Sequence, residues 1–363
     1  MKKFLIGALV LAAAGFGIWK YMDKIAALPA APRNDKPVIK VGVILPLTGN
    51  LASMGQAAKG AVEVAAEKIK REDTKYSYEF IFEDNQWSPA KTAVILSKFI
   101  SVDKIDALLD GGSAVGKVTS PKTEERQIIH LNVWASDKRA AEGKYNFVNH
   151  TQPEYEASRL TKVIKDKGYA NVIIVSVNDE GCLVVSKALQ KELDSAGVKN
   201  RMETINLGTR DFKIMIEKMQ KENPDLYVEI MWEPELNIFL KQMGELGYKT
   251  DITTIEAIPF DNLYQFEGRW YVDAAEGKGP VMNEIRAHNK SDTVYGVSNM
   301  YDNVMLLVGA FEKAESKDKA VDELIKVKEY EGVTGRLAQD DEGVFQSQAV
   351  VKKVVNGKSV VME

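Results

Sequence analysis

Short apolar runs alternate along the chain with longer amphipathic stretches. Apolar runs rich in β-branched residues predict strands over residues 38–45, 78–83, 104–109, 127–134, 171–177, 225–231 and 252–255. Stretches with helical spacing predict helices over residues 57–69, 155–167, 183–196, 211–221, 234–246 and 298–316, with further helices beginning at Ser88 and after Gly116. Strands that alternate with helices of this length form parallel sheets with helices on both faces, so the pattern predicts an α/β fold. The alternation runs twice, which predicts two Rossmann-like lobes.

Three short motifs add local detail to this pattern. Ser53 and Gln56 have the spacing of a capping box, which predicts the start of the first helix. Ser88 followed by Pro89 has the pattern of an N-cap and a first helical residue. Near the end of the chain, residues 349–361 have a hairpin pattern, in which Asn356-Gly357 predicts a type I′ turn.

The first 37 residues differ from the rest. Phe4 to Trp19 is an uncharged, mostly apolar run behind Lys2 and Lys3, as is typical of a secretory signal. Two alternatives stay open: cleavage near residues 12–14, which frees the protein, or retention of residues 4–22 as an N-terminal membrane anchor. Both alternatives place the body outside the cytoplasm, in the periplasm or an equivalent extracytoplasmic space. The three prolines in residues 26–37 predict a linker.

Composition narrows the classes of function. The 363 residues suit two domains, and the net charge is -4. The first 37 residues carry six basic and two acidic side chains, so the body is acidic, which argues against nucleic acid as the main partner. A single cysteine, Cys182, excludes a disulfide within the chain and a thiolate metal cluster. The three histidines have no ligand-like spacing, so we predict neither a metal site nor a cofactor.

Two segments of the sequence partly match motifs of known enzymes, but neither match is complete. Residues 111–118 nearly fit a phosphate-binding loop, but Val118 stands where a hydroxyl group must hold Mg²⁺. Ser113 is not in a nucleophile elbow, because Val115 occupies the position of the last glycine. We therefore predict that the chain is not an enzyme and has no catalytic residues.

An ordered set of motifs resembles one family. The set comprises Ile39 to Gly49 with Gly55 and Gly60-Ala61, then Glu83-Asp84-Asn85, Lys221 to Asp225, Pro234-Glu235 and Tyr330 to Gly335. In this order the motifs resemble the type I periplasmic solute-binding proteins, in particular the leucine/isoleucine/valine-binding group that serves ABC importers. The resemblance extends from about residue 39 to residue 358.

The resemblance implies two α/β lobes that are joined by three crossings and close on a ligand in the cleft between them. The crossings are expected near residues 149–153, 278–282 and 332–335. The first lobe would comprise residues 38–151 with 282–332, and the second lobe residues 152–281 with 333–363. The implied function is to capture an amino-acid-like small molecule and deliver it to an ABC transporter permease. The alternative is a membrane-tethered sensor of the same fold that passes a signal to a partner protein.

The resemblance also implies ligand-binding residues. Hydroxyl and backbone N–H groups of Ser113, Ala114, Ala135 and Ser136 would hold the ligand carboxylate, Glu256 would meet its ammonium group, and Trp232 would cover it. Ordinary structural roles are the alternative for each: helix caps for the serines, a solvated loop acid for Glu256 and packing for Trp232.

Four further candidate ligand-binding positions, Met54, Trp134, Asp179 and Gly181, lie where the sequence departs from the family pattern. Met54 replaces an aromatic residue of the branched-chain binders, and the loop with Asp179 and Gly181 lacks a tyrosine that relatives often carry. Trp134 and Asp137 flank Ala135-Ser136, and Asp137 would repel a carboxylate if it pointed inward. The side-chain pocket is therefore expected to be rebuilt for another amino acid, an amide or a small carboxylate.

Overall fold

The computed structural model describes residues 36–258, 262–291 and 295–362. The chain divides into two units, Met1–Pro37 and Val38–Glu363, and the second unit holds all the elements described below. The predicted signal or anchor over residues 4–22 lies outside the described residues. In the described part of the chain, no helix has both the length and the apolar character needed to cross a membrane.

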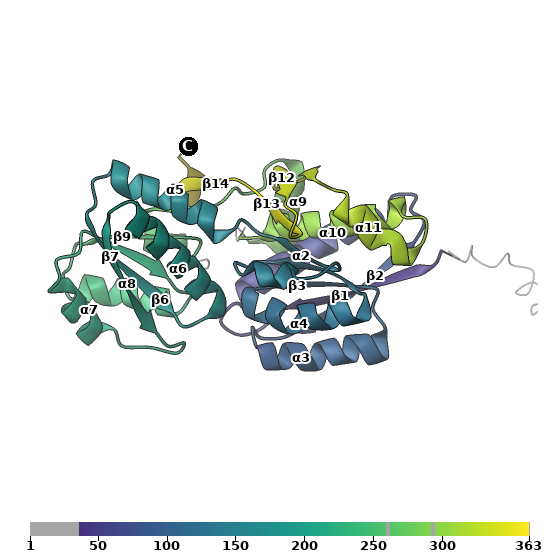
Figure 1. Cartoon of the computed structure of the whole chain (residues 1–363), viewed down its shortest axis with the longest axis horizontal. Helices are drawn as coiled ribbons and strands as arrows, with labels where there is room; N and C mark the ends of the chain where they lie inside the picture. Colours follow the sequence, from purple (N-terminus) through teal and green to yellow (C-terminus); the bar gives the residue numbers. More distant parts are fainter. Residues whose placement is uncertain (1–35, 259–261, 292–294, 363) are drawn as a thin grey trace, which may run out of the picture. The chain divides into compact units, whose positions relative to one another are not determined.

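The elements of the body alternate as the sequence predicts (Figure 1). The helices are α2 (Ala52–Ile69), α3 (Pro89–Lys98), η1 (Phe99–Asp103), α4 (Ser113–Arg126), η2 (Lys138–Ala141), α5 (Pro153–Asp166), α6 (Glu180–Ser195), α7 (Lys213–Gln220), α8 (Glu235–Glu245), η3 (Leu263–Phe266), α9 (Pro280–Asn289), α10 (Val297–Lys313), η4 (Lys317–Lys319) and α11 (Ala320–Ile325). The strands are β1 (Val38–Leu45), β2 (Ser77–Asp84), β3 (Ala107–Gly111), β4 (Ile129–Val133), β5 (Asn146–Asn149), β6 (Asn171–Val177), β7 (Lys199–Ile205), β8 (Leu226–Ile230), β9 (Asp251–Thr254), β10 (Trp270–Ala274), β11 (Glu329–Glu331), β12 (Arg336–Gln339), β13 (Val344–Gln346), β14 (Ala349–Val355) and β15 (Lys358–Val361).

The first lobe is built on an eight-stranded sheet in the order β11-β12-β13-β5-β4-β3-β1-β2. Strands β1 to β5 are parallel. Alternate residues of a strand point to opposite faces, and β1 is buried on both. Val41 and Val43 pack in the core that includes α2 and α10, whereas Ile44 packs with Leu96 and Phe99 on the side of α3. Helices therefore cover both faces of this sheet, and Figure 1 shows α3 and α4 side by side on one of them.

The second lobe combines a parallel and an antiparallel sheet. Strands β7-β6-β8-β9 are parallel, and β10-β14-β15 are antiparallel. A bridge between Ile255 and Val272 links the two sheets. Asn356 and Gly357 both have positive φ, at 54° and 67°, which confirms the predicted type I′ turn between β14 and β15.

Local motifs hold at some helix starts and fail at others. The Ser88 side chain accepts a hydrogen bond from the Lys91 amide and Pro89 follows it, as predicted. The predicted Ser53–Gln56 capping box is wrong, because α2 begins at Ala52. The side-chain amide of Gln56 (Nε2) donates to the Leu47 carbonyl instead. Helix α4 begins at Ser113, earlier than predicted, because Gly112 with φ 95° turns the chain directly out of β3.

The predicted assignment of residues 333–363 to the second lobe is wrong for its first part. Gly332 and Gly335 exchange backbone hydrogen bonds in a tight turn, and Gly335 has φ 106°. This turn sends β12 back along β11, and β13 then pairs in parallel with β5 of the first sheet. The chain therefore changes sheets between Gln346 and Ala349, not at residues 332–335.

Candidate functional site

Two loops of the first lobe meet at the carboxyl ends of β3 and β4. The Asp137 amide donates to Ser113 Oγ at 3.1 Å, and Ser113 is buried at the first residue of α4. Ser113 is not a side-chain cap of α4, because the N-cap residue is Gly112. Since its hydroxyl oxygen accepts from Asp137, its proton can be donated elsewhere. Ala135 and Ser136 are buried in the same loop, so the predicted pair of loops does come together.

Asp137 does not present a bare negative charge at these loops. Its carboxylate accepts from the Arg139 backbone amide at 3.0 Å and from Arg139 Nε at 2.9 Å. Burial disfavours the charge, but the hydrogen bonds and the charge of Arg139 outweigh it and lower the pKa of Asp137. The repulsion that the sequence suggested between Asp137 and a ligand carboxylate is therefore offset by a neighbouring cation.

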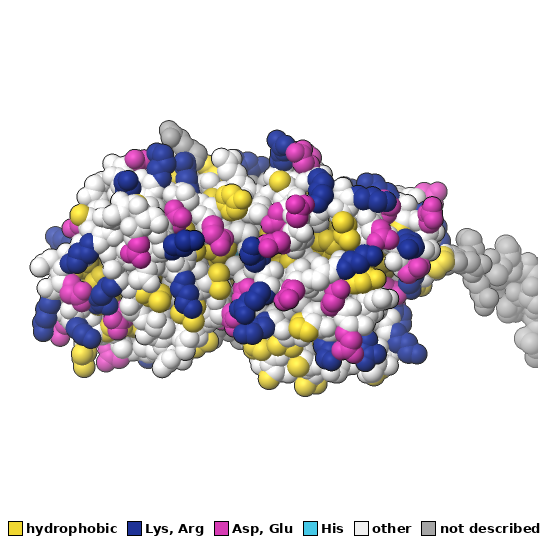
Figure 2. Space-filling model, viewed as in Figure 1, with side chains coloured by type: hydrophobic (Ala, Val, Ile, Leu, Met, Phe, Trp, Pro, Cys, Tyr) yellow, Lys and Arg dark blue, Asp and Glu magenta, His cyan; other side chains and the backbone are white. Residues whose placement is uncertain are grey.

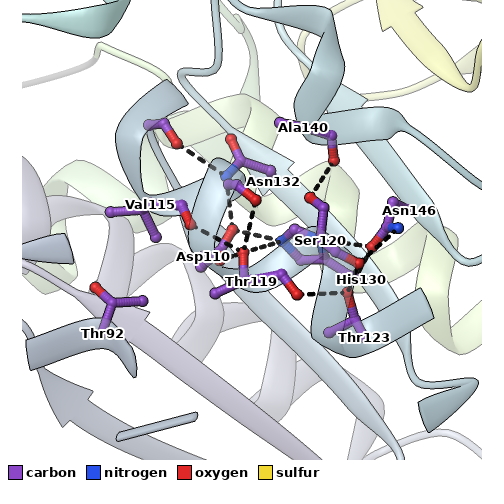
Figure 3. Close-up of polar contacts among 12 residues, drawn as sticks. Thr92, Asp110, Val115, Thr119, Ser120, Thr123, His130, Asn132, Ala140 and Asn146 are labelled. Carbon is purple, nitrogen blue, oxygen red and sulfur yellow. Dashed lines mark hydrogen bonds and ion pairs between the residues drawn. The ribbon is translucent and has the colours of Figure 1, made fainter. Parts of the chain in front are cut away.

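A buried polar network supports the two loops from behind (Figure 3). His130 Nε2 lies 2.7 Å from Asp110 Oδ1, which also accepts from Asn132 at 2.7 Å. Thr119 on α4 donates to the other carboxylate oxygen of Asp110 at 2.7 Å. The network joins β3, β4 and α4 at the base of the predicted carboxylate site. His130 is thus a structural residue, as its lack of ligand-like spacing suggested.

The second lobe contributes the start of α6. Asp179 is the N-cap, and its carboxylate accepts a hydrogen bond from the Gly181 backbone amide at 3.1 Å. Burial raises the pKa of Asp179, although this hydrogen bond acts to lower it. Glu180 reaches the first lobe, where its carboxylate lies 3.1 Å from Lys117 Nζ and 2.8 Å from Arg139 Nη2. The predicted positions 179 and 181 therefore lie where the two lobes touch.

Glu256 is buried, and its carboxylate is already engaged by the protein. Oε1 lies 2.8 Å from His150 Nε2, and Oε2 accepts from the Tyr295 hydroxyl at 3.0 Å. Burial opposes ionisation of Glu256, but the charge of His150 and the bonds to its carboxylate outweigh it and lower its pKa. Burial likewise opposes a charge on His150, and Glu256 raises the pKa of His150 in spite of it. The two residues form a buried ion pair.

Two more acids stand beside this pair. One carboxylate oxygen each from Glu156, Glu256 and Asp273 lies within 4.8 Å of the other two. Lys352 is fully buried with its Nζ 2.7 Å from Asp273 and 2.7 Å from Glu276. Burial raises the pKa of Asp273 to about 6 and, with the charge of Glu256, raises that of Glu156 well above its usual range. The three carboxyl groups are close enough for a cation, but His150 and Lys352 already supply positive charge to them.

Aromatic side chains from both lobes surround this centre. The rings of Trp134 and Tyr295 lie nearly parallel with centroids 6.3 Å apart, and Trp87 lies 6.3 Å from Trp134. Trp232 of the second lobe lies 6.2 Å from Tyr295. Trp134 has φ 66°, and its indole fits only because Gly111 and Gly296 lack side chains: a Cβ atom there would stand 2.3 and 1.9 Å from it.

Sequence reasoning missed His150, Tyr295, Trp87, Glu156 and Lys352. No sequence signal marks His150, because the three histidines have no ligand-like spacing along the chain. No local pattern places Tyr295 beside Glu256, because the two side chains meet only through tertiary packing. Met54, in contrast, belongs to the apolar core of the first lobe, where it is 1% exposed.

Comparisons with known proteins identify the family and the fold. The family described as periplasmic binding protein matches residues 38–358. A leucine-, isoleucine-, valine-, threonine- and alanine-binding protein of Pseudomonas aeruginosa is 21% identical over 332 residues, 84% of this chain and 86% of the relative. The structure of a leucine-binding protein of Thermotoga maritima has a TM-score of 0.82 at 19% identity and covers 90% of this chain and 98% of that chain. A solute-binding protein of an R. palustris ABC transporter, in complex with 4-hydroxybenzoate, has a TM-score of 0.81 at 17% identity, with 90% and 96% covered.

These matches confirm the predicted fold class and the predicted kind of protein. The neighbours share the α/β architecture of parallel sheets flanked by helices, and the matched proteins are substrate-binding proteins, as expected for a chain that is not an enzyme. Figure 2 shows basic and acidic side chains interspersed over the face in view. Because the family model matches residues 38–358, this chain belongs to the periplasmic binding protein family, and the solved neighbours share its type I fold.

Proposed function

We propose that this chain captures an amino-acid-like molecule or a related small carboxylate between its two lobes, outside the cytoplasm, and delivers it to an ABC transporter permease. The observation that carries the proposal is the meeting of polar groups from both lobes. Ser113 of the first lobe lies beside Gly181 of the second, and Arg139 of the first lobe pairs with Glu180 of the second. The Tyr295 hydroxyl of the first lobe donates to Glu256 of the second. A ligand held there would contact both lobes at once and so stabilise their closure.

The carboxylate end would be held by the first lobe. The Ser113 hydroxyl, the amides of Ser113 and Ala114 at the start of α4, and the loop at Ala135 and Ser136 offer donors to an anion. Trp232 and Glu256 would contact the rest of the ligand from the second lobe. Residues 4–22 would direct export of the body or anchor it to the membrane. The family relationship supports delivery to a permease, and the related proteins bind amino acids or an aromatic acid.

Ligand-induced stabilisation tests this function directly. The full chain is unfolded, refolded to remove carried-over ligand, and heated with amino acids, amides and small carboxylates in turn. A ligand at 100 times its Kd that binds only the folded state adds about 2.7 kcal/mol. In a protein of this size that is a rise in Tm of a few degrees.

Variants then assign the rise in Tm to the proposed site. Ser113→Ala is expected to reduce it, whereas Ser97→Ala, at an exposed serine on α3, is expected to leave it unchanged. If no compound of these classes raises the Tm, the proposed function is wrong.

A further inference from the structure

We propose that the ligand of this site is an aromatic carboxylate without an ammonium group, because the protein itself fills the ammonium position with His150. The inference rests on the proposed function and narrows its ligand class. It turns on three features of the centre: the two partners of Glu256, the paired state of the nearby acids, and the aromatic rings between the lobes.

Under the proposed function, Glu256 would be the counter-ion of the ammonium group of an amino-acid ligand. Both of its oxygens are used, one by His150 Nε2 at 2.8 Å and the other by the Tyr295 hydroxyl at 3.0 Å. The three residues are only 3%, 3% and 6% exposed, so water does not take over these contacts when they are broken. A ligand ammonium would have to displace the imidazolium of His150 and leave it buried without its partner, which is strongly unfavourable. If it entered beside His150 instead, the two positive charges would repel each other in a site with little water.

The neighbouring acids do not offer a substitute acceptor. Asp273 is held by Lys352 at 2.7 Å, and Glu156 lies fully buried behind Glu256. The hollow lined by His150, Asp273 and Tyr295 has a volume of about 10 Å³, which is room for about one water molecule. Burial and the charge of Glu256 raise the pKa of Glu156, which disfavours its charged form. An additional cationic group therefore has neither an unpaired, charged carboxylate among these acids nor space at this point.

The opposite end of the site favours an anion. Ser113 keeps a hydroxyl proton to donate, and α4 begins there with its backbone amides. Asp137, whose backbone amide donates to Ser113, has its carboxylate paired with Arg139. A ligand with one negative charge and no positive charge therefore matches what the two ends of the site leave available.

The aromatic side chains of the site indicate what kind of group carries the ligand carboxylate. Four aromatic rings form a cluster in which each ring centroid lies within 6.3 Å of a neighbouring one. The rings are those of Trp87, Trp134 and Tyr295 of the first lobe and Trp232 of the second. Flat aromatic groups gain from offset or edge-to-face contacts with such rings in addition to the apolar surface they bury. A ring carrying a carboxylate fits this set better than a branched aliphatic chain.

A matched pair of ligands provides the test. 3-Phenylpropanoate and phenylalanine share ring and carboxylate and differ only in the ammonium group. In titration calorimetry on refolded full chain, 3-phenylpropanoate or benzoate is expected to bind about tenfold or more tightly than phenylalanine or leucine. Equal or tighter binding of either amino acid would overturn the inference and leave the proposed function standing. If none of the four compounds binds, the inference is wrong, and the wider set of compounds in the Tm experiment decides the proposed function.

Variants separate the role of His150 from general packing. His150→Gln removes the internal cation, so the preference for 3-phenylpropanoate over phenylalanine is expected to fall about tenfold. His288→Gln, at an exposed histidine paired with Glu63, is the control and leaves the ratio unchanged. Tyr295→Phe keeps the ring and frees one oxygen of Glu256, so it provides a second test if the His150 variant does not fold. An unchanged ratio in a folded variant of either kind contradicts the inference.

Discussion

Gly181 at the start of α6 lies against Ser113 at the start of α4, since a Cβ atom at residue 181 would stand 3.2 Å from Ser113 Oγ. The two residues belong to different lobes and are 68 positions apart in the sequence. Their contact brings two helix N-termini together, with backbone amides from both sides. It also makes the size of residue 181 a determinant of how closely the lobes approach.

Enlarging residue 181 should therefore weaken ligand binding. A valine in Gly181→Val would press on Ser113, and overpacking of this kind costs about 1–3 kcal/mol, so the affinity should fall about tenfold or more. The affinity is measured by calorimetry with whichever ligand raises the Tm of the wild type. Gly244→Ala on α8 is the control, because nothing lies within 4 Å of a Cβ atom there. Unchanged affinity in Gly181→Val would show that the closed contact is not needed for binding.

Loss of the charge of Glu180 should speed ligand release. Glu180→Gln removes the ion pairs to Lys117 and Arg139 that join the lobes. Exposed pairs contribute about 0.2–1 kcal/mol each, so we expect a two- to fivefold higher dissociation rate, measured by stopped flow. Added salt should produce the same acceleration in the wild type and little in the variant. The control, Glu245→Gln, removes a surface ion pair with Lys213 inside one lobe and should leave the dissociation rate unchanged. A faster rate in this variant too would indicate a general effect of charge and would contradict the prediction.

Lys352 should be required for stability. Lys352→Met would leave Asp273 and Glu276 without their buried cation, and removing one partner of a buried ion pair costs about 3–5 kcal/mol. We expect a marked fall in the denaturant midpoint of the ligand-free protein. Lys353→Met, one residue along the same strand and only half-buried, should change it little. Equal effects of the two variants would contradict the importance of the buried pair.

The buried acids should make stability depend on pH. The pKa of Asp273 is raised to about 6 and that of Glu156 is raised well above its usual range, so the folded state holds these protons more tightly than the unfolded state. This contribution is complete below the unfolded pKa values near 4 and is lost as the pH rises.

Glu156→Gln removes the titration of one of these acids while keeping the shape of its side chain. The variant's free energy of unfolding should equal that of the wild type near pH 4. At higher pH it should exceed that of the wild type, by up to about 1.4 kcal/mol per pH unit. Thermal unfolding from pH 4 to pH 8 measures the difference. Glu154→Gln, at an exposed position of the same helix, should track the wild type throughout.

Much of the fold could be predicted because its signals are local. The apolar run of β1, the Ser88-Pro89 helix start and the Asn356-Gly357 turn each depend on a few adjacent residues, and each forms as predicted. The meeting of Ser113 with the loop at Asp137 also follows from the sequence, because neighbouring parallel strands end at the same edge of a sheet. The capping box at Ser53 is wrong because α2 begins before Ser53, and the Gln56 side chain donates to the Leu47 carbonyl in the preceding loop.

By itself, the sequence determined the alternation of strands and helices, the family and the loops that carry the candidate site. Only the tertiary structure decided what those residues do for one another. It placed His150 and Tyr295 on Glu256, buried Lys352 between two acids, and kept β12 and β13 on the first lobe. The physical reason is that local patterns report backbone preference and the burial of single elements. The pairing of buried charges depends instead on distances across the fold, which no spacing along the chain encodes.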